Sequence, residues 1–232
     1  GLVDVAFATG RGYTLVTVLG GLFVLGARLE RRTHLAPMIV GNTGNLGLPL
    51  ALFAFGPEGL SLAVVVFAIM AIYAFTVGIW LVSGGGQPLA IIKEPLVAAT
   101  LLGGLFLING WQTPVFLTNT IDLIGQMAIP LMLITLGVAV ARLKPASLSR
   151  AVLLSLVKYL ICAGRALIAG LWFGLNEVAL AVLILQVSTP VAVTSYLLAE
   201  KYGADADEVA GLVVASTLLS LITLPLTLAF LV

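Results

Sequence analysis

The chain has 232 residues, of which 61% are hydrophobic and 9% are charged, and its formal net charge is +1 at pH 7. Soluble domains have roughly 25% charged residues, so this composition excludes an ordinary water-soluble fold and predicts a polytopic helical membrane protein with no nucleic acid as partner. One cysteine and one histidine exclude an internal disulfide and a Cys/His zinc cluster, so neither a metal nor a cofactor is expected.

Apolar segments of about 17 to 25 residues are needed to cross a bilayer as a helix. Eight such segments stand between turn or charge signals, which predicts an all-α membrane protein with eight transmembrane helices. Because the number is even, both ends of the chain are expected on one side of the membrane. The predicted helices are residues 12–28, 35–55, 59–82, 90–109, 119–141, 150–173, 177–199 and 207–231.

Basic residues indicate which side is the cytoplasm. They gather in the connections 28–33, 83–93, 142–150 and 200–208, whereas the opposite face has only Arg11. The excess of Lys and Arg in cytoplasmic loops predicts that these four connections are cytoplasmic and that both termini lie outside, in a multi-pass protein of the bacterial inner membrane. The basic residues concerned are Arg28, Arg31, Arg32, Lys93, Arg142, Lys144, Arg150 and Lys201.

Two helix starts have capping signals. Asn176 immediately precedes the seventh predicted helix, and Asp205 with Glu208 forms a D-x-x-E pattern before the eighth. Side-chain oxygens at such positions accept hydrogen bonds from the free N–H groups of the first helical turn. We therefore interpret these three residues as structural.

The second predicted helix is interrupted at 41–49 (GNTGNLGLP). Three glycines, two asparagines and a proline lie at hydrocarbon depth, where each unsatisfied backbone group would cost several kcal/mol. Pro49 removes one backbone donor, and the glycines allow the chain to leave helical geometry, so that freed backbone groups can face a ligand. Asn42 and Asn45 are three positions apart, so on a helical stretch they share a face and offer donors and acceptors to one bound group.

The seventh predicted helix has a matching interruption at 186–190 (QVSTP). The first three and last three predicted helices share one order of elements in opposite orientations, which is typical of transporters whose site lies where two broken helices meet. Helix N-termini at such a point favour an anionic group such as a carboxylate. The structural alternative is that these small residues and prolines serve only helix packing. The substrate-binding residues expected here are Asn42, Thr43, Gly44, Asn45, Pro49, Ser188, Thr189 and Pro190.

Two charges lie inside the sixth predicted helix. Lys158 and Arg165 are seven positions apart and share a face, and a charge within the membrane is a functional candidate. Arg165 is a candidate substrate-binding residue, with pairing to an acid or reaching the outer interface as alternatives. Lys158 is nearer the cytoplasmic end and is expected to extend its amine to that interface. Gln126 in the fifth predicted helix is expected to help line a cavity.

Several stretches of the sequence, and the order in which they occur, resemble the auxin efflux carrier family of membrane transporters. They extend over most of the chain, although the family usually has Asn where Glu94 stands. The stretches are 41–50 (GNTGNLGLPL), 93–98 (KEPLVA) with Gly103, 129–137 (IPLMLITLG), 189–190 (TP), 198–203 (LAEKYG) and 216–225 (STLLSLITLP).

The resemblance implies ten helices in two inverted repeats of five, of which this chain would correspond to helices three to ten and lack the first two. Residues 1–82 would be helices three to five, 83–89 a cytoplasmic linker, and 90–232 the second repeat, with scaffold helices six and seven followed by helices eight to ten of a moving domain. The family implies a secondary transporter of small organic anions such as carboxylates, working in the lipid bilayer by elevator-type alternating access.

Two alternatives stand beside this function. The chain could be a non-transporting membrane scaffold, or a truncated remnant of a carrier. An enzyme is not expected, because the predicted helices contain no nucleophile with a base and no paired acids. The oligomeric state is open, and a homodimer is one candidate.

Overall fold

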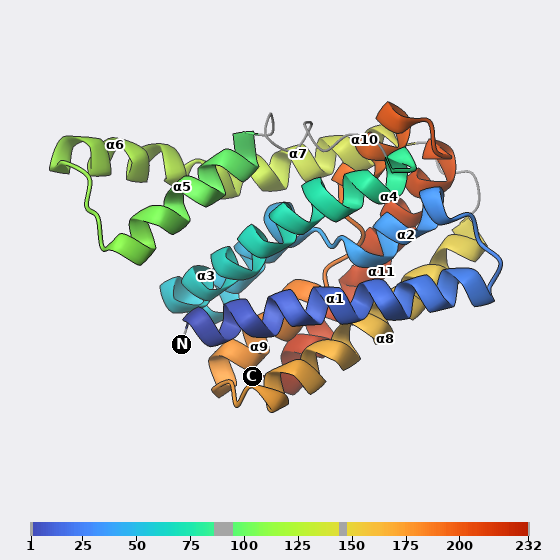
Figure 1. Ribbon diagram of the computed structural model, residues 1–232, viewed down its shortest axis with the longest axis horizontal. Coiled ribbons are helices and arrows are strands. Elements are labelled where there is room, and N and C mark those ends of the chain that lie inside the picture. Colours follow the sequence, from blue (N-terminus) through green and yellow to red (C-terminus); the bar gives the residue numbers. More distant parts are fainter. Residues whose placement is uncertain (1, 86–94, 144–147, 232) are drawn as a thin grey trace.

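A computed structural model describes residues 2–85, 95–143 and 148–231 (Figure 1). Every element in these ranges is helical. The elements are α1 (Leu2–Gly26), α2 (Arg31–Ile39), the π-helical turn η1 (Thr43–Gly47), α3 (Leu48–Tyr73), the π-helical turn η2 (Ala74–Gly78), α4 (Ile79–Ser83), α5 (Pro95–Asn109), α6 (Val115–Gln126), α7 (Ala128–Arg142), α8 (Leu148–Trp172), α9 (Glu177–Val187), α10 (Val193–Tyr202) and α11 (Ala206–Leu231).

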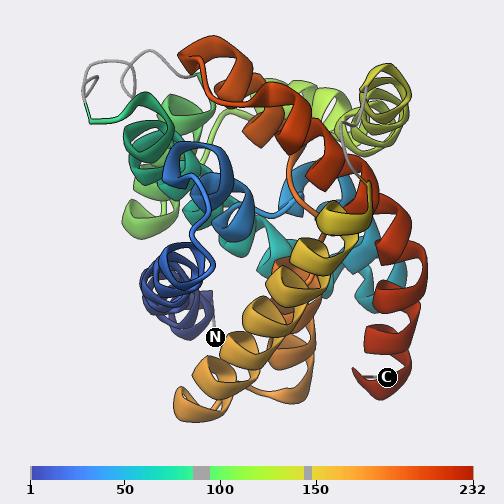
Figure 2. The same cartoon turned by 90° about the vertical axis from the view of Figure 1, so that its right-hand side faces the viewer.

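Most of the buried side chains belong to one bundle. Helix α8 lies between α1 and α11 (Figure 2), and α3 packs against α9 and α1. Val16, Val66, Val182 and Leu185 are fully buried where these helices meet. Helices α5 and α6 lie to one side of the bundle (Figure 1), and α7 packs against η1. Leu136 is the only buried residue of α6 and α7.

Five helices of the described chain are long and apolar enough to cross a membrane, whereas the sequence predicts eight. The helix Thr43–Ser83 covers most of two predicted spans, 35–55 and 59–82, and the second interruption divides the predicted span 177–199 into the short helices α9 and α10. Part of the predicted span 90–109 lies outside the described residues. The five helices are Leu2–Gly26, Thr43–Ser83, Val115–Arg142, Leu148–Trp172 and Ala206–Leu231.

The start of the first helix differs from the prediction, whereas the division of α3 agrees with it. The first helix begins at Leu2 instead of residue 12. Arg11 does not interrupt it, because its side chain is exposed and its guanidinium lies 5.4 Å from the centre of the Phe173 ring. Within α3, Gly56 has φ 64° and ψ −159°, a conformation that is essentially restricted to glycine. The chain therefore turns at Gly56, and α3 consists of two helices, as the predicted spans 35–55 and 59–82 require.

Parts of the four basic connections meet at one end of the bundle. The Arg32 guanidinium donates to the carbonyl oxygens of Val82 at 2.9 Å and Tyr202 at 2.7 Å. Arg150 lies 3.5 Å from the Glu208 carboxylate. The segments near residues 32, 82, 150 and 202–208 therefore share one end, as predicted for connections on one face of the membrane. The basic residues of these connections that lie outside the described residues are Lys93 and Lys144.

Both predicted helix caps are confirmed. The Asn176 side-chain oxygen accepts a 2.8 Å hydrogen bond from the Ala179 N–H at the start of α9. Asp205 accepts a 2.9 Å hydrogen bond from the Glu208 N–H at the start of α11. Each cap satisfies one of the N–H groups that a helix start leaves free.

Replacing Asn176 with Ala is expected to lower stability by about 1 kcal/mol, because the Ala179 N–H loses its acceptor. Thermal unfolding in detergent should show a melting temperature about 2 to 4 °C lower. Asn176→Asp keeps an acceptor and should melt close to the parent protein. An Asn176→Ala variant as stable as the parent would contradict the capping role.

Candidate functional site

The two interruptions cross each other. The Asn42 N–H donates to the Pro190 carbonyl at 2.8 Å, and the Ala192 N–H donates to the Val40 carbonyl at 3.3 Å, so that Gly41 and Val191 form an isolated antiparallel bridge. We call residues 40–42 and 188–192 the crossing. Each break leaves backbone N–H and C=O groups without partners in its own helix. The backbone groups of the other break supply these partners inside the bundle.

Gly41 permits this close approach. A Cβ atom at position 41 would lie 2.7 Å from the Thr189 hydroxyl oxygen. That hydroxyl is held in place because it donates to the Gln186 carbonyl at 2.6 Å. A side chain at position 41 would therefore separate the two backbones.

Polar side chains are buried around the crossing without partners. Asn42 is 5% exposed and Gln186 is fully buried. Among the described residues, nothing bonds the Asn42 amide nitrogen, either Gln186 amide atom, or the hydroxyls of Thr43, Ser188 and Ser195. Each such atom costs about 1–3 kcal/mol when it is left unpaired. This concentration of unused donors and acceptors indicates a place that binds polar groups.

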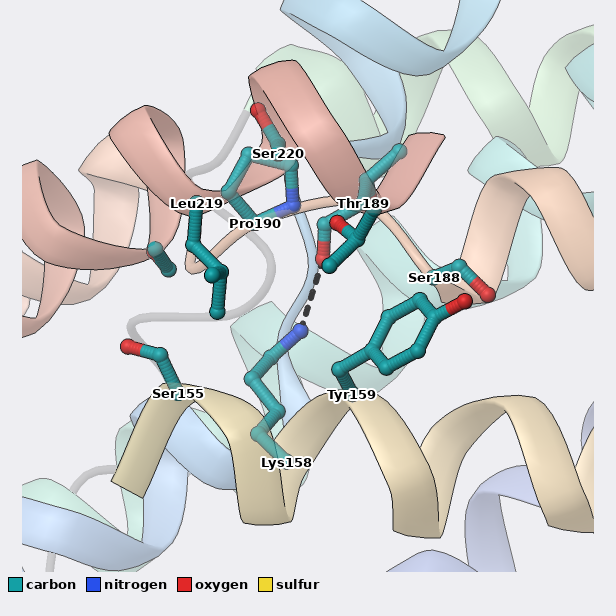
Figure 3. Close-up of a pocket in the computed structure, with 10 residues that line it drawn as sticks. Ser155, Lys158, Tyr159, Ser188, Thr189, Pro190, Leu219 and Ser220 are labelled. Atoms are coloured by element: carbon teal, nitrogen blue, oxygen red, sulfur yellow. Dashed lines mark hydrogen bonds between the residues drawn. The ribbon is translucent and has the colours of Figure 1, made fainter. Parts of the chain in front are cut away.

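Lys158 reaches the crossing from α8. It is 3% exposed, and its Nζ donates to the Thr189 carbonyl at 2.8 Å (Figure 3). The prediction that it extends to the cytoplasmic interface is therefore wrong: the helix break frees a carbonyl inside the bundle, and this carbonyl is a nearer acceptor. Within the described chain, no carboxylate forms an ion pair with this amine. A buried cation without a counter-ion favours an anion beside it.

A small pocket lies beside the Lys158 amine, between α8, the crossing and α11 (Figure 3). Its volume of about 10 Å³ has room for one water molecule. A larger ligand therefore needs these three elements to move apart. The lining residues are Ser155, Lys158, Tyr159, Ser188, Thr189, Pro190, Ser216, Leu219, Ser220 and Thr223.

Most of the site residues predicted from the two breaks lie at or next to the crossing. Asn42, Ser188, Thr189 and Pro190 belong to it, and Thr43 is buried immediately after it.

The remaining residues predicted from the first break follow in η1 and α3. Gly44 packs against Phe67, where a Cβ atom would lie 2.8 Å from the ring. Asn45 is half-buried in η1, and Pro49 is buried in the first turn of α3.

Two predicted residues are not brought to the crossing. Gln126 is exposed at the end of α6, in the part of the structure that lies to one side of the bundle. Arg165 is buried against α1, with its guanidinium 4.5 Å from the centre of the Tyr13 ring. Within the described residues, its Nε and Nη2 atoms have no hydrogen-bond acceptor.

Polar residues of α8 and α11 were missed as site residues. Ser216 accepts a hydrogen bond from the Val191 N–H at 2.9 Å and so ties α11 to the crossing. The sequence has a signal for this face: Ser216, Ser220 and Thr223 recur at helical spacing on one side of an apolar helix. On α8, Ser155 shares a face with Lys158 in the same way.

Two interrupted helices that cross among buried polar groups, inside an apolar helical bundle, are an arrangement found in membrane transporters. Residues 87–228 match the family model described as membrane transport protein, and the chain belongs to this family. The resemblance to the auxin efflux carriers, predicted from the sequence, is thereby confirmed.

Two curated relatives are archaeal. The chain is 33% identical over 196 residues to an uncharacterized transporter of Methanothermobacter thermautotrophicus, covering 80% of this chain and 63% of the relative. It is 26% identical over 204 residues to an uncharacterized transporter of Methanocaldococcus jannaschii, covering 81% of this chain and 64% of the relative. The chain thus spans somewhat less than two thirds of the length of either relative.

Proposed function

We propose that the protein is a secondary carrier of small organic anions such as carboxylates, which bind at the crossing. The observation that carries this proposal is the Lys158 amine, which is buried beside the Thr189 carbonyl without an acidic partner among the described residues. An ammonium group has three donors, and the contact with Thr189 uses one of them. The other two are free for a carboxylate.

Neutral hydrogen-bond donors around the crossing also suit a carboxylate, in addition to the Lys158 amine. The hydroxyl of Ser188 and the amide nitrogens of Asn42 and Gln186 are buried donors without described partners. A carboxylate has two oxygens that accept such bonds, and charge-assisted bonds to it are stronger than neutral ones. The binding of an anion would offset part of the cost of burying these groups.

The small size of the pocket supports a carrier that changes conformation. With room for one water molecule, the pocket excludes even a small carboxylate unless α8, α11 or the crossing moves. Carriers of this architecture move one part of the molecule against another. Helices α5 and α6 extend away from the bundle (Figure 1), and α7 packs against η1 at the first break, so that these three helices lie beside the crossing as a scaffold would.

The same proposal includes the membrane arrangement. Eight spans would result if each interrupted helix, α2 with η1 and α9 with α10, crosses the bilayer as one unit and α5 crosses as well. The order of a continuous helix, an interrupted helix and a continuous helix occurs at α1 to α4 and again at α8 to α11, which supports two inverted repeats. The basic end of the bundle would face the cytoplasm, with the chain ends outside.

The test is thermal stability of the detergent-purified protein against acetate, succinate, malate and benzoate. A ligand at 100 times its dissociation constant stabilises the folded state by about 2.7 kcal/mol, which corresponds to a rise of about 5 to 10 °C in melting temperature. Asn42→Ala and Asn45→Ala should each reduce this rise.

Asn109→Ala is the matched control, because Asn109 is an exposed amide on α5 and should leave the rise unchanged. If a well-folded sample shows no rise with any of the acids, the carboxylate proposal is wrong. A non-transporting membrane scaffold would then be the better interpretation.

A further inference from the structure

The pocket beside Lys158 is lined mainly by hydroxyl groups. Seven of its ten lining residues carry a hydroxyl, whereas Pro190 and Leu219 are apolar and Lys158 is the charged residue among those described (Figure 3). Four of the hydroxyl residues lie on the two long helices that border the pocket. We call them the hydroxyl wall: Ser155 on α8, and Ser216, Ser220 and Thr223 on α11. A ligand held by the Lys158 amine therefore meets hydroxyl groups with the rest of its surface.

The serine protons of this wall are used within the helices themselves. Ser155 donates to the Ala151 carbonyl at 2.7 Å, and Ser220 donates to the Thr217 carbonyl at 2.6 Å. Ser216 likewise donates to a carbonyl one turn back in α11. Because donor and acceptor lie on the same helix, these bonds survive when whole helices move apart to admit a ligand. The serine oxygens therefore remain as acceptors for a ligand.

The unused donors of the pocket belong to Lys158 and Ser188. The Lys158 amine has two N–H groups left after its bond to the Thr189 carbonyl. Ser188 is 4% exposed, and among the described residues nothing bonds its hydroxyl. The pocket thus combines donors for an anion with acceptors for a neutral O–H group. Ser155 precedes Lys158 by one turn of α8, so one small ligand can reach both kinds of group.

Three other substituents suit this lining less well than a hydroxyl. A second carboxylate would bring its lone pairs to the serine oxygens, and the described lining has no second cation to neutralise it. An ammonium group, as in an amino acid, would lie beside the buried Lys158 ammonium, where little water screens their repulsion. A methyl group would bury the serine oxygens without giving them a hydrogen bond.

We infer that the carried anion is a small 2-hydroxy monocarboxylate, whose carboxylate binds the Lys158 amine and whose hydroxyl donates to the hydroxyl wall. The hydroxyl is assigned to the carbon next to the carboxylate because the closed pocket has room for one water molecule, and each further ligand atom requires a wider opening. This inference rests on the proposed function, from which it takes the carboxylate at Lys158 and to which it adds the specificity.

Three acids with the same number of non-hydrogen atoms test the specificity. Glycolate, propionate and glycine have respectively a hydroxyl, a methyl and an ammonium group on the carbon next to the carboxylate, and malonate has a second carboxylate there. Dissociation constants come from the rise in melting temperature of the detergent-purified protein with ligand concentration. We expect glycolate to bind about 10-fold more tightly than propionate, and more tightly than glycine or malonate.

Serine variants test where the ligand hydroxyl binds. Ser155→Ala and Ser220→Ala should each lower the preference for glycolate over propionate to about 3-fold, because each removes one acceptor. Ser61→Ala is the matched control, since Ser61 is an exposed serine on α3 that donates to the Pro57 carbonyl of its own helix at 3.0 Å. It should keep the preference of the parent protein.

The outcomes separate this inference from the proposed function. Propionate or malonate binding as tightly as glycolate would overturn the 2-hydroxy specificity while the anion carrier stands. A preference that persists unchanged in both serine variants would overturn the assignment of the ligand hydroxyl to the hydroxyl wall. Glycine binding more tightly than the three anions, or no binding of any of the four to a well-folded sample, would contradict the anion site and the specificity together.

Discussion

Replacing Lys158 with Met is expected to weaken anion binding strongly, while the unliganded protein melts near the parent temperature. Met keeps most of the apolar volume of the side chain and removes the buried amine that donates to the Thr189 carbonyl. A hydrogen bond between charged groups contributes about 1.5–3 kcal/mol, so its loss should weaken carboxylate binding by about 10- to 100-fold. Removing the buried charge relieves its desolvation cost, which offsets the cost of about 1–3 kcal/mol for leaving the Thr189 carbonyl unpaired, so the apo protein should melt near the parent temperature.

The measurement compares melting temperatures with and without the binding acid. Lys201→Met is the matched control, because Lys201 is an exposed lysine at the end of α10 and should leave both values unchanged. A Lys158→Met variant that still shows the full ligand-dependent rise would exclude the amine from the site. A variant that melts well below the parent would indicate that the lysine has a structural role.

A methyl group at position 41 is expected to separate the two broken helices. The Cβ atom of Gly41→Ala would lie 2.7 Å from the Thr189 hydroxyl oxygen, which is too close for a contact between carbon and oxygen. Overpacking of this kind costs about 1–3 kcal/mol, or a fall of about 2 to 12 °C in melting temperature, and ligand binding should be lost with the crossing.

A double-mutant cycle makes this prediction specific. Thr189→Ala removes the oxygen that the new methyl group meets, so Gly41→Ala combined with Thr189→Ala should be less destabilised than the sum of the two single changes by about 1 kcal/mol or more. Gly104→Ala, in α5 with no atom within 4 Å of the new Cβ, should be neutral or stabilising. Additive effects in the cycle would show that the two residues do not meet.

The positions of both helix breaks could be predicted from the sequence. Gly, Asn and Pro in apolar segments leave backbone groups without partners, and lipid provides none, so 41–49 and 186–190 had to leave regular helical geometry within the protein. That Asn42 bonds to Pro190 and Val40 to Ala192 could not be predicted. The residues lie about 150 positions apart, and no local preference relates them.

Three side chains lie elsewhere than the sequence predicts, because their surroundings depend on other helices. Lys158 was expected at the interface because distance along its own helix was the available measure, but its acceptor is a carbonyl released by a break in another helix. Gln126 has the polarity expected of a cavity-lining residue, yet α6 lies to one side of the bundle. Arg165 shares a helix with Lys158 and instead meets Tyr13 on α1.

The lipid surroundings, the helical class, the caps and the two helix breaks are all predictable from local sequence, because they follow from composition and from the cost of unpaired backbone groups in lipid. Which groups meet at the crossing depends on the packing of whole helices: the paired breaks, the Lys158 amine and the Ser216 hydroxyl come together only in the folded bundle. These contacts join segments far apart in the chain, and they form only when the packing of whole helices brings those segments together.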